Sequence, residues 1–325
     1  MSIIQEPLVF TPVYKDYLWG GDKISSQYKR TSTPDICAES WEISAHPDGM
    51  SIVAQGSYQG LTLNELTKRF GIDLIGTLAP QSDNFPLLFK IIDARRKLSV
   101  QVHPNNGNAS ITGGEPKTEM WYILGCEEES SLYAGMVETA TSQSVAEAIS
   151  NGTVADQLVE LRVKPDEALF IPGGLVHAIG DGCLIYEVQQ NSNTTYRMFD
   201  WNRTDAAGNP RQLHVKESLA TIDWSLKPPA MLTPEQNRES TGASWSKVVS
   251  CEFFTMQKLD LTGSAEILHN KESFTALFLS SGAATVTSGG QSVKLKKGSS
   301  ALIPAAAKSC TIITEDPSTI LITTL

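Results

Sequence analysis

The feature that most constrains this sequence is a series of short apolar runs, rich in β-branched and aromatic residues and separated by Gly, Pro, Asn and Asp. Such runs are typical of β-strands that end in turns. The clearest are LLFKII, LSVQVH, EMWYIL, ALFIP, CLIYEVQ, SFTALFL, AATVTS and SVKLKK. Many strands with little helical periodicity predict sandwiches or barrels rather than an alternating β/α chain. Neither GxGxxG nor GxxxxGK[ST] occurs, so we expect no Rossmann dinucleotide site and no P-loop.

Three short stretches carry helical signals. Residues 62–65 (TLNE) spell a capping box before an amphipathic stretch, and Gly71 lies where that helix would end. Residues 144–147 repeat the capping pattern before an Ala-rich segment, which the Asn-Gly pair at 151–152 would end. Apolar spacing over residues 215–222 predicts one further short helix. Helices are therefore expected to be few and short.

Composition and charge limit the partners and the compartment. The 325 residues are 41% hydrophobic and 19% charged, which suits about two globular domains. A formal net charge of −10 would repel a polyphosphate backbone, so we expect no nucleic-acid partner. There is no signal-peptide pattern, and no apolar run approaches the ~18–20 residues that cross a bilayer. Five scattered cysteines without a CxxC pair agree with a cytoplasmic protein that has no membrane partner. The sequence leaves the oligomeric state open.

A change in composition predicts a boundary between two units. Residues 225–245 are rich in Pro, Ser and Glu, and we interpret them as a linker. We predict a catalytic, metal-binding domain with short helical segments over residues 1–235 and a C-terminal β domain over residues 246–325. An internal sequence repeat supports two related units, because residues 163–179 align with residues 295–311 around a shared proline.

The two copies of the repeat differ at two positions where the first copy has a side chain that could bind a metal. His177 in the first unit faces Ser309 in the second, and Glu119 faces Ala276. The second unit therefore lacks the side chains that could bind a metal. This pattern predicts a chemically active barrel followed by a structural copy.

Four polar residues of the first unit form a candidate metal site. Gln101 and His103 alternate along one strand and so point to the same face. An unpaired amide or imidazole costs ~1–3 kcal/mol when buried, and a bound metal would offset that cost. Glu119 begins another strand, and His177 follows a turn that contains Pro-Gly-Gly. Two imidazoles, a carboxylate and an amide oxygen suit Zn²⁺, with Fe²⁺, Mn²⁺ and Co²⁺ as alternatives.

The motifs, taken together, resemble those of a known family. The Pro-x-Gly-x-x-His element at residues 172–177 matches the second metal motif of the cupin superfamily, and the chain resembles the short bacterial form of the type I mannose-6-phosphate isomerases. The resemblance covers most of the first 200 residues and rests on YLWGG, ESWEISAHP, FPLLFKII, LSVQVHPN, KTEM, IPGGLVHAIG, EVQQNSNTTYR and DWNR. It implies a mainly β fold of two cupin-type jelly-roll barrels with a few short helices, and one Zn²⁺ per chain.

The resemblance also implies an activity and a role for several residues. The family interconverts mannose 6-phosphate and fructose 6-phosphate through an enediolate, and its active-site arginine corresponds to Arg197. Its zinc ligands correspond to the four residues selected above. Lys90 and Lys117 lie in matched motifs and are predicted to bind the phosphosugar substrate through its phosphate, while Glu187 is predicted to bind a hydroxyl or to handle a proton. Asn193 stands where family members usually have Asp, which leaves the identity of the catalytic base open.

Two other functions remain open at this point. A His/Glu/His set also suits Fe²⁺, as in a cupin oxygenase. A sugar-phosphate-binding module without catalysis is the second alternative, and Asn193 gives it some weight. Gln101, Arg197 and the two lysines favour the phosphosugar isomerase. The preferred sugar phosphate and the direction of the reaction are not fixed by the sequence.

Overall fold

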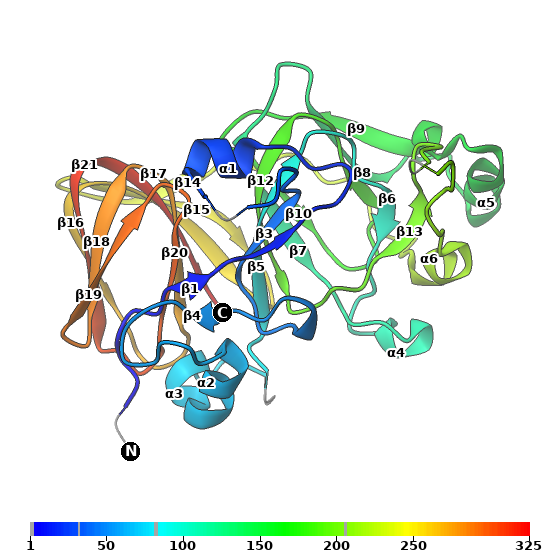
Figure 1. Cartoon of the computed structure of the whole chain (residues 1–325). Helices are drawn as coiled ribbons and strands as arrows, with labels where there is room; N and C mark the ends of the chain where they lie inside the picture. The colour runs from blue at the N-terminus through cyan, green and yellow to red at the C-terminus, as the bar shows by residue number, and fades with distance from the viewer. Residues whose placement is uncertain (1–2, 32, 81–83, 205–206) are drawn as a thin grey trace.

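Strands dominate the fold, as the sequence predicted. A computed structural model describes residues 3–31, 33–80, 84–204 and 207–325. Figure 1 shows the strands of the N-terminal part on one side, the C-terminal strands β14 to β21 on the other, and the short helices at the periphery. The expectation of a mainly β chain with a few short helices is confirmed.

The N-terminal part contains two antiparallel sheets that face each other. One has six strands in the order β10-β7-β12-β5-β3-β2, and the other has five in the order β13-β6-β11-β8-β9. Apolar side chains of both sheets, such as Trp121 and Ile185 from one and Leu132 and Ile179 from the other, share a buried cluster. The strands are β1 (Phe10–Thr11), which pairs with β4, β2 (Val13–Lys15), β3 (Glu39–Ile43), β4 (Ile52–Val53), β5 (Leu87–Ala94), β6 (Val100–Val102), β7 (Glu119–Gly125), β8 (Ser131–Met136), β9 (Leu158–Arg162), β10 (Ala168–Ile171), β11 (His177–Ile179), β12 (Cys183–Gln190) and β13 (Tyr196–Phe199).

The C-terminal part is an eight-stranded antiparallel sheet that encloses its own apolar cluster. Six strands follow the order β14-β15-β16-β21-β17-β20, while β18 pairs with β19 and β21. Their bounds are β14 (Glu235–Ser240), β15 (Ala243–Ser250), β16 (Thr255–Leu268), β17 (Thr275–Ser281), β18 (Ala283–Ser288), β19 (Gln291–Lys296), β20 (Ser300–Ile303) and β21 (Ser309–Thr324).

The interval predicted as a linker is partly strand. Residues 235–240 form β14, which pairs with β15 through contacts such as Glu235 with Lys247. All six residues of β14 are exposed, so this edge strand carries no alternation of apolar and polar residues that could reveal it in the sequence. The prediction that the linker extends to residue 245 was therefore wrong. The division into two domains stays a prediction.

The two parts share a hydrophobic core. The rings of Phe85 and Phe274 lie 4.6 Å apart, and those of Tyr186 and Phe278 stack at 4.2 Å. All four side chains are almost fully buried. Such aromatic pairs add stability beyond the area that they bury, so the C-terminal sheet supports the strands that carry the N-terminal site.

The capping signals located the helices, with one error. α2 (Leu63–Phe70) begins at the predicted capping box of Thr62 and Glu65 and ends at Gly71. α5 (Ser142–Asn151) begins before the predicted start, because Thr141 is the N-cap and Ser144 closes its box. The remaining helices are α1 (Lys23–Tyr28), α3 (Ile72–Ile75), α4 (Ala109–Thr112), α6 (Val215–Thr221) and the short 3₁₀ turns η1 (Pro47–Gly49) and η2 (Val154–Gln157).

Strand pairing corrects the alignment of the two copies of the internal sequence repeat. Ile171 pairs with Glu119 in the first unit, and the equivalent Ile303 pairs with Thr275 in the second. Thr275, rather than Ala276, therefore occupies the position of Glu119. The sequence alignment was shifted by one residue here, because both runs are apolar and a slip changes little in their pattern.

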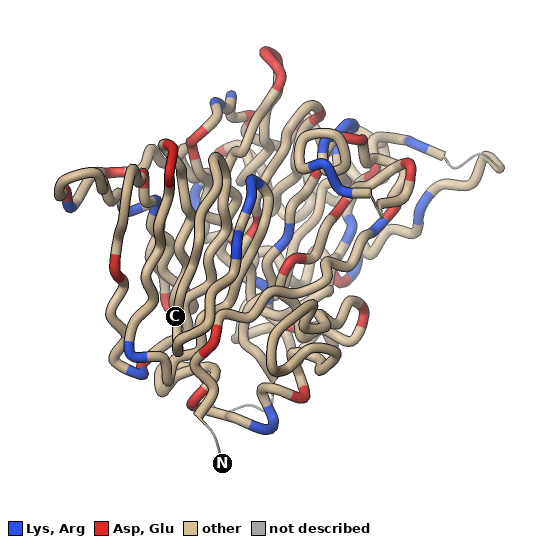
Figure 2. The backbone as a smooth tube through the Cα atoms, turned by 60° about the vertical axis from the view of Figure 1, so that its left-hand side comes forward, with Lys and Arg blue, Asp and Glu red and all other residues tan. Residues whose placement is uncertain are grey.

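Charged residues of both signs are mixed along the chain, as Figure 2 shows. In the described residues, every helix falls short of the length and apolarity that a bilayer crossing requires.

Asp93 on β5 offers a test of how the fold buries a carboxyl group. Its side chain is fully buried, Oδ2 accepts a hydrogen bond from the amide of Lys23 at 2.7 Å, and burial raises the pKa of Asp93 to about 6. The folded state thus favours the protonated acid, and this contribution to stability is lost as the pH rises through about 6. We expect Asp93→Asn to raise the free energy of unfolding by about 1–3 kcal/mol at pH 8 and to change it little near pH 4. Thermal melts of both proteins at pH 8 and pH 4 measure this change in stability, with a substitution at the exposed Asp35, Asp35→Asn, as the control. An equal change in stability at the two pH values would contradict the prediction.

Candidate active site

Three predicted metal ligands converge between the two N-terminal sheets. His103 Nε2 and His177 Nε2 lie 3.2 Å apart, and Glu119 approaches them at 3.6 Å and 3.4 Å respectively. The fourth, Gln101, places its amide 3.3 Å from His177 Nε2. His177 comes from β11, Glu119 from β7 and Gln101 from β6, so both sheets contribute. The chain therefore brings together all four residues that the sequence selected.

A glycine turn fixes the two histidines relative to each other. Gly174 adopts a φ of +96°, and its amide donates to the carbonyl of His103 at 2.7 Å. At Gly173 a Cβ would lie 2.7 Å from the carbonyl oxygen of Pro104, so no larger residue fits this close approach. The Pro-Gly-Gly element that precedes His177 thus packs directly on the backbone that carries His103.

The protonation of the cluster leaves its donor atoms available to a cation. His177 Nδ1 donates to the carbonyl of Leu175 at 2.9 Å, so Nε2 carries the lone pair. Burial lowers the pKa of His177 to about 4 and that of His103 well below its usual range. Among the described residues, Oε1 of the fully buried Glu119 receives no hydrogen bond, while Oε2 pairs with Lys117. The lone pairs of His103 Nε2, His177 Nε2 and Glu119 Oε1 face one another in a buried site, which is costly, and a divalent cation would satisfy them. The donor set therefore fits a metal.

Arg197 lies in register with Gln101 and His177 across three neighbouring strands. In the five-stranded sheet, Gln101 of β6 pairs with His177 of β11 on one side and with Arg197 of β13 on the other. Directly paired residues point to the same face of a sheet. The Arg197 guanidinium donates to Ser99 Oγ at 3.3 Å and to the carbonyl of Gln212 at 2.9 Å. The predicted catalytic arginine thus lies beside the ligand cluster.

The opposite sheet presents a buried lysine between two carboxylates. Lys90 Nζ lies 3.3 Å from Glu187 Oε1 and 3.7 Å from Glu39 Oε2. Each carboxylate also accepts an indole hydrogen bond, Glu187 from Trp121 at 2.8 Å and Glu39 from Trp41 at 2.7 Å. Burial raises the pKa of Glu187, but the attraction of Lys90 and the Trp121 hydrogen bond outweigh it, so the pKa lies below its usual range. Glu187 is therefore held as the anion.

Lys117 connects this group to the metal ligands. Its Nζ lies 3.0 Å from Glu119 Oε2 and 3.2 Å from His103 Nε2, and its side chain is only 5% exposed. Lys117 therefore contacts the predicted ligands themselves.

One cavity connects these groups. It measures about 290 Å³ and is lined by Gln101, Lys90, Lys117, Glu187 and Arg197, together with Tyr17, Trp19, Glu39, Ile92, Leu98, Ser99, Ile179, Asn193, Thr195 and Arg211. Every predicted substrate-binding and catalytic residue lines it. This volume suits a small polar molecule at the metal cluster.

Asn193, the departure from the family pattern, lies at the rim of this cavity. Its amide donates to Asp48 Oδ2 at 2.7 Å, and its backbone amide donates to Glu115 Oε2 at 3.1 Å. His46 Nε2 lies 3.3 Å from the same Glu115 oxygen. An amide at position 193 can donate to Asp48, whereas an ionised carboxylate would repel it. Asn193 thus ties together three loops around the opening.

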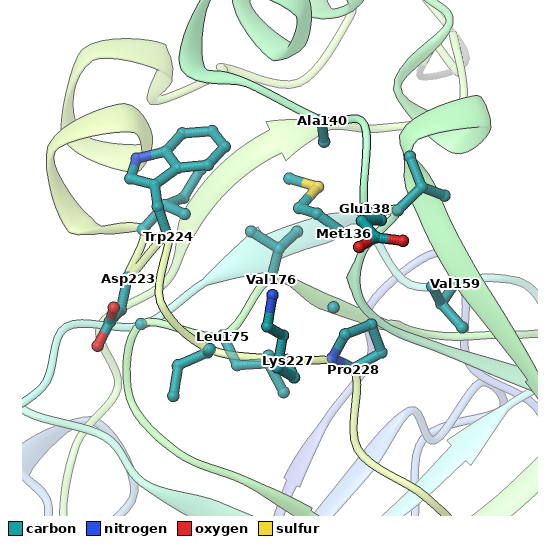
Figure 3. A pocket seen from close by; sticks show the side chains of 15 residues that line it. Met136, Glu138, Ala140, Val159, Leu175, Val176, Asp223, Trp224, Lys227 and Pro228 are labelled. Carbon is teal, nitrogen blue, oxygen red and sulfur yellow. The ribbon is translucent and has the colours of Figure 1, made fainter.

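A second cavity lies on the other side of the turn that precedes His177. Figure 3 shows Trp224, Met136, Val176, Lys227 and Pro228 around it. Its volume is about 340 Å³, and none of the predicted site residues lines it. The chemistry therefore belongs to the smaller cavity.

Comparison with known proteins identifies the family. Residues 8–120 match the family described as phosphomannose isomerase type I, catalytic domain. The chain is 37% identical over 301 residues to mannose-6-phosphate isomerase ManA of Bacillus subtilis (strain 168), covering 92% of this chain and 93% of that protein. The chain belongs to the type I mannose-6-phosphate isomerases. The mannose-6-phosphate isomerase of Streptococcus mutans is also 34% identical, over 94% of both chains.

The comparisons confirm the fold class as well as the family. The crystal structure of the Bacillus subtilis mannose 6-phosphate isomerase superimposes with a TM-score of 0.89 at 31% identity, covering 98% of this chain and 99% of that one. Residues 245–316 match the family described as mannose-6-phosphate isomerase, cupin domain. The cupin-type β fold expected for a type I isomerase is therefore present.

Sequence reasoning missed two members of this type I isomerase site. Glu39, the second carboxylate on Lys90, lies in the matched segment ESWEISAHP but was not singled out. Arg211 lines the cavity from outside every matched motif. Pairing of β3 with β5 brings Glu39 to the site, and the contact with Asp200 holds Arg211 there.

Proposed function

We propose that this chain is a metal-dependent aldose-ketose isomerase that interconverts mannose 6-phosphate and fructose 6-phosphate through an enediolate. The observation that carries the proposal is the convergence of Gln101, His103, Glu119 and His177 next to a cavity, which Gln101 lines together with two buried lysines and an arginine. The names of the Bacillus subtilis and Streptococcus mutans relatives support the same substrate.

We propose Zn²⁺ as the cation that these four residues hold. Two neutral imidazoles and a carboxylate are typical zinc ligands, and a half-turn of the Gln101 amide would present its oxygen as the fourth. When bound, such an ion supplies positive charge that stabilises an oxyanion beside it.

The chain's own cations supply the remaining stabilisation. Arg197 would donate to the oxygen on which charge develops as the proton moves between C1 and C2 of the open-chain sugar. Lys117, beside Glu119, and Lys90, beside Glu187, would donate to the hydroxyls of the sugar. Because both lysines are held in place by carboxylates, they need little reorganisation when the substrate arrives.

Glu187 is the proposed proton carrier. It is held as the anion, is almost fully buried and lines the cavity that would hold the sugar. A carboxylate in this setting can accept the proton from one carbon and return it to the other. Trp121 and Lys90 fix its orientation through the contacts described above.

Metal removal tests the proposal directly. We expect the purified protein to contain about one zinc per chain, the stoichiometry of a single four-ligand site. Chelation should reduce isomerase turnover by at least about 100-fold, and added Zn²⁺ should restore it. The measurements are elemental analysis and a coupled mannose 6-phosphate assay before and after chelation.

Other results would support other functions. Iron in the purified protein with oxygen consumption would indicate a cupin oxygenase. Binding of sugar phosphate without turnover would indicate a non-catalytic module. A cytoplasmic location and the absence of a nucleic-acid partner stay predictions from composition.

A further inference from the structure

The lysines of the site are occupied by carboxylates of the protein. Lys90 is paired with Glu39 and Glu187, and Lys117 lies beside Glu119. Arg197 lies beside the ligand cluster as well, so these three cations and three carboxylates carry no net charge. Apart from a metal ion, the inner end of the cavity therefore has no excess positive charge that could neutralise a phosphate dianion.

An excess of positive charge lies at the other end of the same cavity. Arg211 lines it, and Arg203 lies next to Arg211 on the same carboxylate, Asp200. Two guanidinium groups thus share a single aspartate, which leaves one positive charge in excess. The adjoining cavity adds Arg96 and Asp16, whose charges cancel.

Asp200 holds Arg211 in a defined orientation. Its carboxylate is 7% exposed and accepts from Arg211 Nε at 2.6 Å and from Nη2 at 2.5 Å. This contact uses one edge of the guanidinium and leaves the Nη1 side for another acceptor. Arg203 Nη2 binds the same carboxylate, and its Nη1 donates to the carbonyl of Lys97 at 2.6 Å. Arg211 is therefore oriented in advance, which reduces the entropy lost when an anion binds.

The chemistry of the substrate requires its two ends to lie apart. In a 6-phosphosugar the reacting carbons C1 and C2 are at the opposite end of the carbon chain from the phosphate. With C1 and C2 at the metal ligands, the phosphate must reach away from Lys117, which touches those ligands. Arg211 also lines the adjoining cavity, which contains none of the ligands, so it lies toward that far end.

We propose that Arg211, oriented by Asp200, binds the phosphate of the substrate and selects phosphorylated over free sugars. This inference rests on the proposed function. Arg211 and a phosphate oxygen would form a charge-assisted hydrogen bond, for which Arg geometry is well suited. Lys90 and Lys117, which the sequence analysis assigned to the phosphate, would then contact the sugar itself.

The test is Arg211→Ala, assayed with mannose 6-phosphate, mannose and inorganic phosphate. We expect KM for mannose 6-phosphate to rise about 10- to 100-fold, the loss of a charge-assisted hydrogen bond, while kcat changes by less than about threefold. The inhibition constant of inorganic phosphate should rise by a similar factor, and kcat/KM for unphosphorylated mannose should not change. Arg96→Ala is the matched control, because it removes one positive charge from the adjoining cavity without touching the substrate cavity.

Calorimetric titration separates this proposal from the proposed function. If the wild type binds mannose 6-phosphate without turning it over, the isomerase proposal fails, and weaker binding by Arg211→Ala still supports the phosphate site. Equal KM, phosphate inhibition and binding in Arg211→Ala and Arg96→Ala would overturn the site. A wild type that binds neither mannose 6-phosphate nor phosphate would overturn both proposals. If Arg211→Ala does not fold, Arg211→Lys tests the site instead. This variant keeps the positive charge but loses the two-pronged contact with Asp200, so its affinity for phosphate should still fall severalfold.

Discussion

His177→Ala is expected to remove both the bound metal and the isomerase activity. His177 Nε2 lies within 3.4 Å of donor atoms from His103, Glu119 and Gln101, so its loss opens one side of the four-residue cluster. The described residues offer no other His, Cys, Asp or Glu group in this arrangement to replace it. We expect the metal content to fall to background and kcat to fall by at least about 10²–10³-fold, the effect of removing one electrostatic stabiliser of an oxyanion.

Elemental analysis and the isomerase assay check this result on the same sample. His269→Ala is a suitable control, because His269 is a partly buried histidine of the C-terminal part whose Nε2 contacts Thr275 Oγ1 at 2.9 Å. That variant should keep full metal content and activity. Full metal content in His177→Ala would remove His177 from the ligand set.

The metal ligands could be predicted because local rules place them. Gln101 and His103 share a face through strand alternation, and a Pro-Gly-Gly turn brings His177 to the backbone of His103. The first relation involves neighbours in the chain, whereas the second joins a recognisable turn to a backbone segment far away in the sequence. The sequence therefore contained enough information to choose the ligand types, and the structure supplied their distances.

The residues that were missed depend on pairing between distant segments. Glu39 reaches Lys90 because β3 pairs with β5, more than 45 residues further along the chain. Arg211 is oriented by Asp200 in a segment without regular alternation of apolar and polar residues. No local pattern reports such contacts, since the register of one strand against another depends on the packing of the whole sheet.

The errors in the fold have the same origin. β14 is exposed at every position, so its strand conformation comes from pairing with β15 and not from its composition. The alignment of the two copies of the repeat was shifted by one residue, because apolar runs of similar length align equally well in either register. Boundaries set by a specific side-chain contact, such as the Thr62 and Glu65 capping box, were located correctly.

Glu187→Gln is expected to abolish proton transfer while leaving substrate binding largely intact. Gln has nearly the same shape as Glu and can still accept the indole hydrogen bond of Trp121, but it cannot take up a proton from carbon. We expect kcat to fall by about 10²–10⁴-fold, the usual contribution of a positioned acid or base. Exchange of the C2 hydrogen of the substrate with deuterated solvent, followed by nuclear magnetic resonance, should stop in this variant.

The chain provides a matched control in Glu39. Glu39 and Glu187 are both buried, both pair with Lys90, both accept an indole hydrogen bond and both line the cavity. Glu39→Gln therefore removes the same charge from Lys90 and should cost less than about tenfold in kcat, as expected for one weakened hydrogen bond. Equal losses in the two variants would mean that the carboxylates act only by holding Lys90 in place. A large loss confined to Glu187→Gln, with solvent exchange abolished, would identify Glu187 as the group that moves the proton, because the two carboxylates have the same charge, similar burial and the same kinds of partner.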